Sequence, residues 1–234
     1  MTSTSGISGA TTLVGILGWP VEQSLSPRMH NAAFAALGLD WAYVALPTPP
    51  DRLEDAVRGL AALGFTGANV TTPHKLAVTA YCDTDAPSVN TLVVREERVE
   101  GWTTDAAILD GLPATSPVVL GDGGSAAAFV QALPHARQFS RRTTWPPDVR
   151  DADLVVNATS ERNEVLVELH AHQTLVDLPY PETATAAAAR RSGATVVTGL
   201  EVLLAQGAAS FALWTGVAAP VEVMRDAVNF ASGL

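Results

Sequence analysis

Cysteine, charge and long apolar runs are all scarce in this 234-residue sequence. Cys82 is its one cysteine, so no disulfide can form within the chain. Charged residues make up only 16% and hydrophobic residues 47%, which excludes a disordered tail protein and favours alanine-rich helices packed on strands. No apolar run approaches the roughly 18 residues that a membrane span needs. The sequence therefore predicts a globular protein of one large domain or two small ones, without a membrane partner.

Positive charge is scarce as well. The net charge is -10 and lysine is rare, whereas nucleic-acid-binding proteins usually display a basic stripe, so we expect no nucleic-acid partner. A small anion can still bind locally. The N-terminus, "MTSTSGISGATTLVGILG", lacks the basic start and long apolar segment of a secretion signal, and we expect a cytoplasmic protein. The five histidines show no ligand spacing, so no metal site is expected.

The first half of the chain alternates strand-like and helix-like segments. "TLVGILG" (12–18), "WAYVAL" (41–46) and "TGANVT" (66–71) have the apolar composition of buried strands. Helical segments separate them, which predicts an α/β fold whose N-terminal domain contains a mostly parallel sheet. In such sheets ligands bind beyond the carboxyl ends of the strands, and residues 69–75 occupy one such end.

Two helices are expected between these strands. The first begins with Ser26 as its N-cap and Pro27 at its first helical position, and it stops at Gly38. The second lies within "PPDRLEDAVRGLAALG" and stops at Gly64. Its apolar face is expected to contain Leu53, Ala56, Val57, Leu60, Ala61 and Leu63.

A second sheet is predicted in the second half of the chain. It begins with a strand that runs through glycines into an alanine-rich helix, "SPVVLGDGGSAAAFVQALP" (116–134). Further segments with the composition of strands are residues 137–140, 153–160, 174–180 and 194–199. We expect one domain of residues 1–108, joined by C-terminal helices from about residue 208 to residue 234, and a second domain of residues 109–207.

Two stretches at predicted strand ends carry candidate binding groups. In "GWPVEQSLSP", Ser24 and Ser26 place two hydroxyls beside helix N-terminal amides, which suits a carboxylate. The structural alternative is that Ser26 only caps the helix and Ser24 is a loop residue. In "NVTTPHK", Lys75 follows a strand end that already offers Asn69 and Thr71. The alternative for Lys75 is a solvated surface lysine.

A series of short motifs runs through nearly the whole chain. They are S-x-S-P-x-x-H-N (24–31), N-V-T-x-P-x-K (69–75), V-N-T (89–91), T-D (104–105), G-x-G-G (121–124), V-N-A-T (156–159), D-x-x-Y (177–180) and the ending "LLAQGAASFALWTG". In these motifs and their order the sequence resembles the shikimate dehydrogenase family. The resemblance implies a substrate domain followed by a shortened Rossmann-like domain, and the reduction of 3-dehydroshikimate to shikimate by NADPH.

The resemblance also implies roles for individual residues. Lys75 would stabilise and protonate the alkoxide that hydride transfer creates, and Asp105 would orient this lysine and bind a ring hydroxyl. His74 is interpreted as structural. The substrate-binding residues that the resemblance implies are Ser24 and Ser26 for the carboxylate with Tyr180 close to it, and Thr71, Asn90 and Gln206 for the other oxygens.

The second domain offers residues for a dinucleotide. Glycines at 121, 123 and 124 would let backbone amides approach the pyrophosphate, although "GDGG" could also be only a tight turn. Arg141 and Arg142 follow the second strand where an acidic residue would bind an NAD ribose, so the sequence predicts NADP. The cofactor-binding candidates are Gly121, Gly123, Gly124, Arg141, Arg142, Thr143 and Gly199.

The nucleotide half departs from the family pattern at several places, among them the short loop after "VNATS". Asp122 puts a carboxylate in the loop that should approach phosphates. Only residues 143–152 separate Arg142 from the next strand, which is short for a helical crossover, so one helix is expected to be lost or reduced to a turn. Glu201 and Val202 replace the glycine and methionine that are usual in the last domain crossing.

These departures keep two alternatives open beside an NADP-dependent dehydrogenase for a small ring carboxylic acid. One is a family member that retains the ring-acid site without a dinucleotide and acts as a lyase, an isomerase or a binding protein, because Lys75 and Asp105 could also serve a proton transfer. The other is a structural or regulatory relative. The protein is expected to be a monomer or a homodimer.

Overall fold

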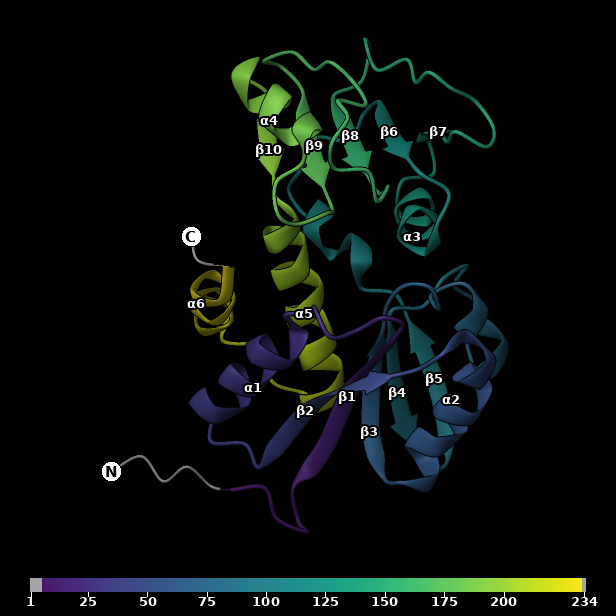
Figure 1. Cartoon of the computed structure of the whole chain (residues 1–234), viewed down its shortest axis with the longest axis vertical. Helices are drawn as coiled ribbons and strands as arrows, with labels where there is room; N and C mark the ends of the chain where they lie inside the picture. The colour runs from purple at the N-terminus through teal and green to yellow at the C-terminus, as the bar shows by residue number, and fades with distance from the viewer. Residues whose placement is uncertain (1–5, 233–234) are drawn as a thin grey trace. The chain divides into compact units, whose positions relative to one another are not determined.

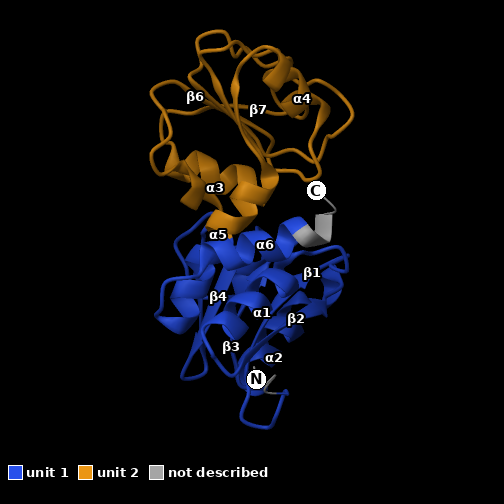
Figure 2. Cartoon of the chain, turned by 90° about the vertical axis from the view of Figure 1, so that its left-hand side faces the viewer, with its two compact units in different colours: residues 1–104, 207–234 blue, residues 105–206 orange. Residues whose placement is uncertain are grey.

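The chain, described as a computed structural model over residues 6–232, contains two compact units. Unit 1 comprises Met1–Thr104 and Gly207–Leu234, and unit 2 comprises Asp105–Gln206 (Figure 2). The division falls within one long helix, α5 (Gly199–Thr215). Each unit has its own five-stranded sheet in the described part of the chain. Helices pack on both sheets, so the α/β fold class predicted from the sequence is confirmed.

The sheet of unit 1 has the strand order β2-β1-β3-β4-β5. Three parallel strands lie where the sequence predicts them, namely β1 (Thr12–Gly18), β2 (Trp41–Pro47) and β3 (Phe65–Val70). β4 (Thr91–Arg95) and β5 (Arg98–Trp102) extend the sheet as an antiparallel hairpin, which the sequence does not predict. The hairpin turns at Glu96 and Glu97, which both have positive φ. Turns of this kind usually contain asparagine or glycine, so the usual signal is missing.

The expected helices of unit 1 are α1 (Ser26–Ala36) and α2 (Leu53–Ala62). Gly38 and Gly64 follow them with φ of 65° and 73°, as expected for glycines that end helices. Two details of the prediction are wrong. The N-cap of α1 is Leu25, and Ser26 is the first helical residue. Leu63 is 73% exposed, because it stands beyond the last turn of α2.

Helices cover both faces of the first sheet (Figure 1). α2 and the short 3-10 helices η1 (Pro50–Arg52) and η2 (Ala77–Tyr81) lie over one face, and α1 with α6 (Val221–Ser232) and the last turns of α5 over the other. Side chains alternate along β3. Ala68 and Val70 join the core under α2, whereas Gly67 and Asn69 face α5.

The sheet of unit 2 is entirely parallel, with the order β10-β9-β8-β6-β7. Its strands confirm the five strand-like segments of the sequence: β6 (Pro117–Leu120), β7 (Arg137–Phe139), β8 (Leu154–Asn157), β9 (Thr174–Asp177) and β10 (Thr195–Val197). A complete Rossmann sheet has the order 3-2-1-4-5-6. Counted from β6, the order here corresponds to 2-1-4-5-6, so the third strand is missing together with its crossover helix.

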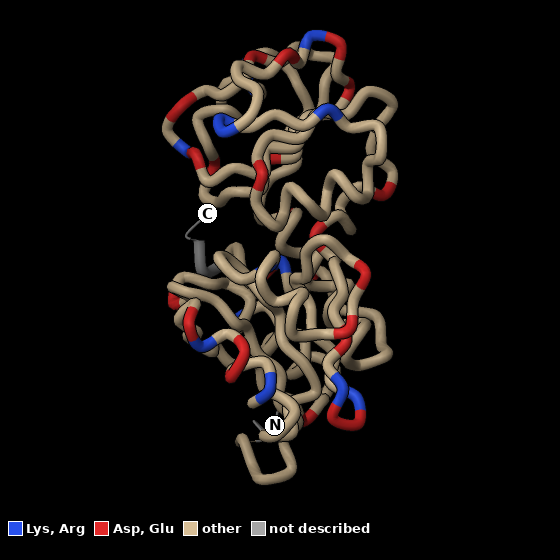
Figure 3. Tube along the Cα trace, turned by 90° about the vertical axis from the view of Figure 1, so that its right-hand side faces the viewer, with Lys and Arg blue, Asp and Glu red and all other residues tan. Residues whose placement is uncertain are grey.

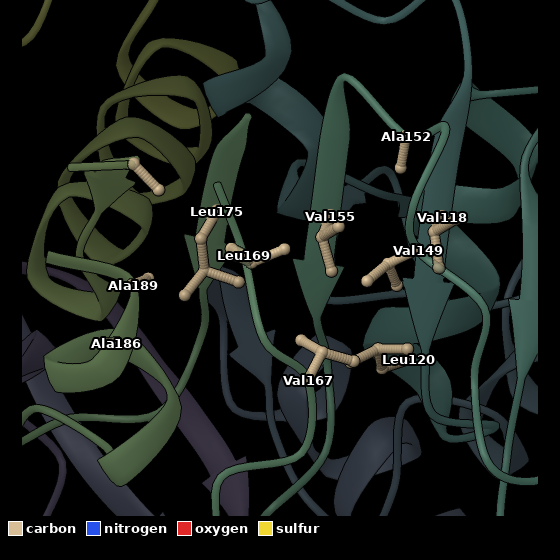
Figure 4. Close-up of a cluster of buried hydrophobic side chains, with 11 residues drawn as sticks. Val118, Leu120, Val149, Ala152, Val155, Val167, Leu169, Leu175, Ala186 and Ala189 are labelled. Atoms are coloured by element: carbon tan, nitrogen blue, oxygen red, sulfur yellow. The ribbon is translucent and has the colours of Figure 1, made fainter. Parts of the chain in front are cut away.

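The helices of unit 2 are α3 (Gly124–Ala132), α4 (Ala184–Arg191) and the 3-10 helix η3 (Asp105–Leu109). The links from β7 to β8 and from β8 to β9 contain no helix. This confirms the expected loss of a crossover helix, and Pro146 and Pro147 are a sufficient reason for it. Extended segments cover the sheet instead (Figure 4). The residues that they bury against β6, β8 and β9 are Val149, Ala152, Val167 and Leu169.

We predict that Gly67 in β3 tolerates no side chain. A Cβ on Gly67 would lie 2.5 Å from Nε1 of Trp214 and would collide with the carbonyl oxygen of Leu92. Gly67→Ala should lower the free energy of unfolding by about 2–3 kcal/mol, because an overpacked core must shift. The measurement is urea unfolding. Gly59→Ala is the matched control: nothing lies within 4 Å of its Cβ position in α2, so it should stabilise by about 0.5–1 kcal/mol. Equal effects of the two variants would contradict this packing.

Candidate functional site

The candidate residues of unit 1 gather at one edge of its sheet. β1 and β3 end at this edge because they are parallel. β4 begins there and β5 ends there, since Asn69 pairs with Thr91 and Thr91 with Trp102 in antiparallel register. The segments that follow or precede these strand ends carry Ser24, Ser26, Thr71, Lys75, Asn90 and Thr104. Asp105 follows Thr104 directly in the chain, as the first residue of η3.

Ser24 and Ser26 lie side by side at the start of α1. The backbone N–H of Ser26 donates to Oγ of Ser24 over 3.3 Å. Leu25, and not Ser26, is the N-cap of α1, so the structural alternative of a capping Ser26 is wrong. Ser26 is buried, whereas Ser24 is only half-buried.

A short turn after β3 fixes the backbone around Lys75. The N–H of Thr71 donates to Leu17 and that of His74 donates to Thr71, both over 2.9 Å. His74 is buried and its Nε2 donates to the carbonyl oxygen of Thr48 over 2.8 Å, which accounts for the structural role expected of it. The carbonyl of Lys75 accepts from the N–H of Val89, so Lys75 lies beside the segment that carries Asn90. Lys75 itself is half-buried.

A buried polar network lies behind this edge. Nδ2 of Asn69 donates to the carbonyl oxygen of Asn90 over 3.0 Å, and it also lies within hydrogen-bond distance of Oγ1 of Thr91 and Oγ of Ser210 in α5. Oδ1 of Asn69 accepts from the phenol of Tyr43 over 2.8 Å. The network thus connects β2, β3, β4 and α5 within unit 1. Ser210 and Tyr43 were missed by the sequence reasoning, although polar residues in otherwise apolar segments are a usable signal.

The side chain of Asn90 is bound to Thr104. Its Nδ2 donates to Oγ1 of Thr104 over 2.9 Å, and its Oδ1 accepts from the N–H of Thr104 over 2.7 Å. These bonds fix the backbone at Thr104, the residue before Asp105. Asp105 itself is buried, with an exposed fraction of 5%.

The glycine-rich loop of unit 2 connects β6 to α3. Gly121 has φ of 118°, and a Cβ there would lie 2.9 Å from the carbonyl oxygen of Ala158, so only glycine fits. Gly123 is the N-cap of α3 and makes no side-chain cap bond. Gly124 opens the helix. The first amides of α3 therefore have the chemistry that a pyrophosphate requires, and the residues present fit a dinucleotide.

Both candidate arginines after β7 have acidic neighbours. Arg141 forms an ion pair with Glu164, and its guanidinium lies 5.4 Å from the ring centre of Trp145. Arg142 lies 3.6 Å from Asp122, the carboxylate of the glycine-rich loop. These side chains are mostly exposed, so each ion pair is weak and a phosphate group could replace the carboxylate. Thr143 donates its backbone N–H to Ser140 over 3.1 Å in the same loop.

The ends of β8 and β9 are joined by a buried carboxylate. Nδ2 of Asn157 donates to Oδ1 of Asp177 over 2.7 Å. Burial raises the pKa of Asp177 above its ordinary value, and the hydrogen bond from Asn157 opposes the rise. Tyr180 follows in the same loop and is half-buried.

The start of α5 contains a capping box. Both the N–H and the hydroxyl of Thr198 donate to Glu201, over 2.7 and 2.8 Å, and the helix begins at Gly199. Glu201, which departs from the family pattern, therefore has a structural role here. A Cβ on Gly199 would lie 2.5 Å from the carbonyl oxygens of Leu178 and Pro179, so close approach requires this glycine. Gln206 stands further along α5, and its Nε2 donates to Leu203.

The described residues offer few other sites. Within residues 6–232, no three His, Cys, Asp or Glu side chains are grouped so as to hold a metal ion. No helix in that range is long and apolar enough to cross a membrane. Acidic positions are spread along both units (Figure 3).

Family profiles match two parts of the chain. Residues 16–92 match "Shikimate dehydrogenase substrate binding domain", and residues 199–228 match "Shikimate 5'-dehydrogenase C-terminal domain". The chain is 39% identical to the shikimate dehydrogenase (NADP(+)) of Methanopyrus kandleri, covering 97% of this chain and 98% of the relative. It is 40% identical to the protein of the same name from Anaeromyxobacter sp., covering 95% and 97%. The first alignment spans 285 positions, more than the 234 residues of this chain, so the relative has segments that this chain lacks.

Solved structures agree with these matches. The shikimate dehydrogenase of Thermus thermophilus, in complex with NADP(H) and shikimate, superposes with a TM-score of 0.84 at 31% identity and covers 94% of this chain and 100% of its own. The enzyme of Aquifex aeolicus gives a TM-score of 0.86 at 29% identity, with 95% and 99% covered.

We predict that His30 in α1 makes unit 1 sensitive to acid. His30 is fully buried, stacks on Tyr43 at 4.5 Å and has no hydrogen-bond partner for either ring nitrogen. Burial lowers the pKa of His30 from 6.5 to about 3. Between these two pH values His30 is therefore protonated in the unfolded chain and neutral in the folded chain. The resulting stability is complete above pH 6.5 and is lost progressively as the pH falls toward 3. Between pH 7 and pH 5, this loss should be about 2 kcal/mol.

The measurement is the free energy of unfolding at several pH values. His30→Leu should remove this part of the pH dependence, whatever its effect at pH 7. His135→Leu, which changes an exposed histidine, should keep the wild-type slope. A His30→Leu variant with an unchanged slope would refute the prediction.

Proposed function

This chain belongs to the shikimate dehydrogenase family, and from that membership we propose that it is an NADP-dependent oxidoreductase that reduces 3-dehydroshikimate, or a close cyclohexene carboxylate relative, to shikimate. This reaction serves the chorismate pathway and aromatic amino acid biosynthesis. We also propose a cytoplasmic location. The observation that carries the proposal is the gathering of hydroxyl, amide and ammonium side chains at one edge of the unit 1 sheet.

We assign the ring acid to unit 1 and the dinucleotide to unit 2. The ring carboxylate would accept hydrogen bonds from Ser24 and Ser26, with Tyr180 as a further donor. Thr71, Asn90 and Gln206 would bind the other oxygens. This assignment is supported by the place of both serines at the start of α1, where the N–H of Ser26 donates to Oγ of Ser24.

The catalytic roles fall to Lys75 and Asp105. NADPH, when bound, supplies a hydride to the carbonyl carbon of the ring. The carbonyl oxygen then becomes an alkoxide, which Lys75 would stabilise with its ammonium group and to which it would donate a proton. Asp105 would orient the ammonium group and accept a hydrogen bond from a ring hydroxyl. Lys75 is half-buried, and backbone hydrogen bonds fix the turn that carries it. Both facts support the catalytic role, since a lysine that only faces solvent needs no fixed backbone.

The cofactor assignment rests on unit 2. The amides of Gly123 and Gly124 at the start of α3 suit the pyrophosphate, and Arg141 and Arg142 suit the 2'-phosphate of NADP. Asp122 and Glu201 depart from the family pattern. They favoured a protein without redox function as long as no contact within unit 2 explained them. The proximity of Asp122 to Arg142 and the capping role of Glu201 remove much of that argument.

The direct test is an absorbance assay of NADPH oxidation with 3-dehydroshikimate, after titration of NADPH by protein fluorescence. Turnover that depends on both compounds is the expected result. Binding of shikimate without any response to the dinucleotide would contradict the proposal and favour the non-redox alternative.

We predict that Lys75→Ala lowers kcat by about a thousandfold with little effect on the affinity for shikimate, because the ammonium group acts mainly in the transition state. Steady-state kinetics and calorimetric titration of shikimate measure the two quantities. Lys75 is the single lysine of the sequence, so amine-directed acetylation of the wild type, which removes the ammonium charge, should cause the same loss, and bound shikimate should protect against it. Arg58→Ala, in an exposed ion pair on α2, is the control. Near-normal turnover of Lys75→Ala would exclude it as the proton donor.

We predict that replacing Arg141 and Arg142 together by alanine raises KM for NADP by at least about tenfold while KM for NAD changes little, because only NADP carries the 2'-phosphate. The ratio of kcat/KM for the two cofactors is the measurement. Arg190→Ala and Arg191→Ala, in the last turn of α4, form the matched pair of controls. An equal loss with NADP and NAD would show that the pair does not read the 2'-phosphate.

A further inference from the structure

We propose that Ser210 of α5 is a positioning residue for the side-chain amide of Asn90, acting through the hydroxyl of Thr104. This inference rests on the proposed function, because it takes Asn90 as a ligand of a ring oxygen of the substrate. It adds a residue to which the family resemblance assigns no role.

Ser210 places a buried hydroxyl in a helix whose other buried side chains are hydrophobic. Its exposed fraction is 0%, so its hydrogen-bond partners must lie inside the protein. These partners belong to the sheet of unit 1. Oγ of Ser210 lies 3.0 Å from Nδ2 of Asn69, 2.8 Å from Oγ1 of Thr91 and 3.2 Å from Oγ1 of Thr104. Side chains from β3, from β4 and from the segment after β5 therefore meet at one oxygen of α5.

The packing of α5 on β4 fixes the place of this oxygen. Nε1 of Trp214, one helical turn after Ser210, donates to the carbonyl oxygen of Leu92 over 2.9 Å. Residues i and i+4 lie on the same face of a helix, so Ser210 and Trp214 contact the consecutive residues Thr91 and Leu92. Gly67 of β3 leaves room for the Trp214 ring. The position of Ser210 against the strand ends is thus determined by the docking of the whole helix.

The orientation of the Asn90 amide follows from its contacts with Thr104. The backbone N–H of Thr104 can only donate, so the atom 2.7 Å from it is Oδ1 of Asn90. Nδ2 of Asn90 donates to Oγ1 of Thr104 over 2.9 Å. Thr104 therefore holds both ends of the amide. The bond to the N–H is fixed by the backbone, whereas the bond to Oγ1 depends on the rotamer of the Thr104 side chain.

Ser210 is the contact from α5 that restricts this rotamer. Oγ1 of Thr104 stands between Nδ2 of Asn90 and Oγ of Ser210, and either hydroxyl can be the donor in the second contact. Thr104 is 7% exposed and Asn90 2%, so bulk water cannot replace these bonds.

The restriction favours binding of the ring acid. Without Oγ of Ser210, Thr104 gains rotamers in which it accepts nothing from Asn90. Substrate binding must then restrict the amide of Asn90 at a cost in entropy. Ser210 therefore prepares Asn90 for a ring oxygen without touching the substrate.

The experiment compares Ser210→Ala with the wild type in steady-state kinetics. The change removes Oγ and adds no atom to the core. We expect KM for 3-dehydroshikimate to rise about fivefold, the effect of one neutral hydrogen bond, with kcat and KM for NADPH within about twofold of the wild type. Thr215→Val, at the end of the same helix, is the matched control. Its hydroxyl bonds only to Phe211 and Val217 of the same segment, so every constant should stay unchanged.

The two KM values separate positioning from a purely structural role. A serine that only stabilises unit 1 would lower the free energy of unfolding without raising one KM above the other. An unchanged KM for the ring acid in Ser210→Ala, an equal rise in both KM values, or a loss confined to kcat would each overturn the inference.

A double variant tests whether Ser210 acts through Thr104. Thr104→Val retains the shape and the backbone N–H of this residue and loses only the hydroxyl. In that background, Ser210→Ala should have no further effect on KM for the ring acid, and independent, multiplicative effects would overturn the inference. In a Thr104→Ser background, which retains the hydroxyl, the effect of Ser210→Ala should persist. If Ser210→Ala fails to fold, Thr104→Val alone replaces it: a selective rise in KM for the ring acid supports the inference, and an unchanged KM overturns it.

Failure of the proposed function would be visible separately. A wild type that does not oxidise NADPH with 3-dehydroshikimate contradicts the function itself. In that case calorimetric titration of shikimate measures the same ratios for the variants without turnover, and a wild-type affinity in Ser210→Ala would overturn the role of Ser210.

Discussion

The amide of Asn69 connects four segments of unit 1 that are distant in the sequence. It accepts from Tyr43 in β2 and lies within hydrogen-bond distance of groups at Asn90, in β4 and in α5. All of these groups are buried, where an unpaired polar atom would cost about 1–3 kcal/mol. The network is therefore stable only when every member is in place. The network therefore fixes the positions of the strand ends from which the candidate substrate residues extend.

In unit 2, other segments cover the sheet face that the missing strand and helices would have covered. The loss of the third strand and of two crossover helices would expose one face of the sheet to water. Val149, Val167 and Leu169 cover it from extended segments, and the small residues of α4 complete the cover. The shortening leaves the glycine-rich loop, the N-terminus of α3 and the two arginines in the chain. A unit of this fold can thus lose part of its sheet while the residues that we propose for a pyrophosphate and a 2'-phosphate remain.

The strands were predictable because a buried parallel strand requires a continuous apolar run with clear ends, as in "TLVGILG" and "DLVVNATS". The hairpin of β4 and β5 was not, because Glu96 and Glu97 adopt positive φ without the usual residue types. The candidate residues came from motifs, and motifs do not show what holds a side chain. The contacts of Asn69 with Tyr43 and of Asp122 with Arg142 join residues far apart in the sequence, and local patterns cannot predict such pairs. The capping box was visible in the sequence, because Thr198 and Glu201 have the residue types and the spacing that such a box requires.

The central claim is that unit 1 binds a ring acid by its carboxylate at the serine pair, with the reacting oxygen beside Lys75. An X-ray structure of the protein crystallised with shikimate and NADP tests this claim most directly. The account predicts the carboxylate within hydrogen-bond distance of Oγ of Ser24 and Oγ of Ser26, and a ring oxygen within hydrogen-bond distance of Nζ of Lys75. Shikimate bound elsewhere on the chain, or bound with its carboxylate away from both serines, would contradict it.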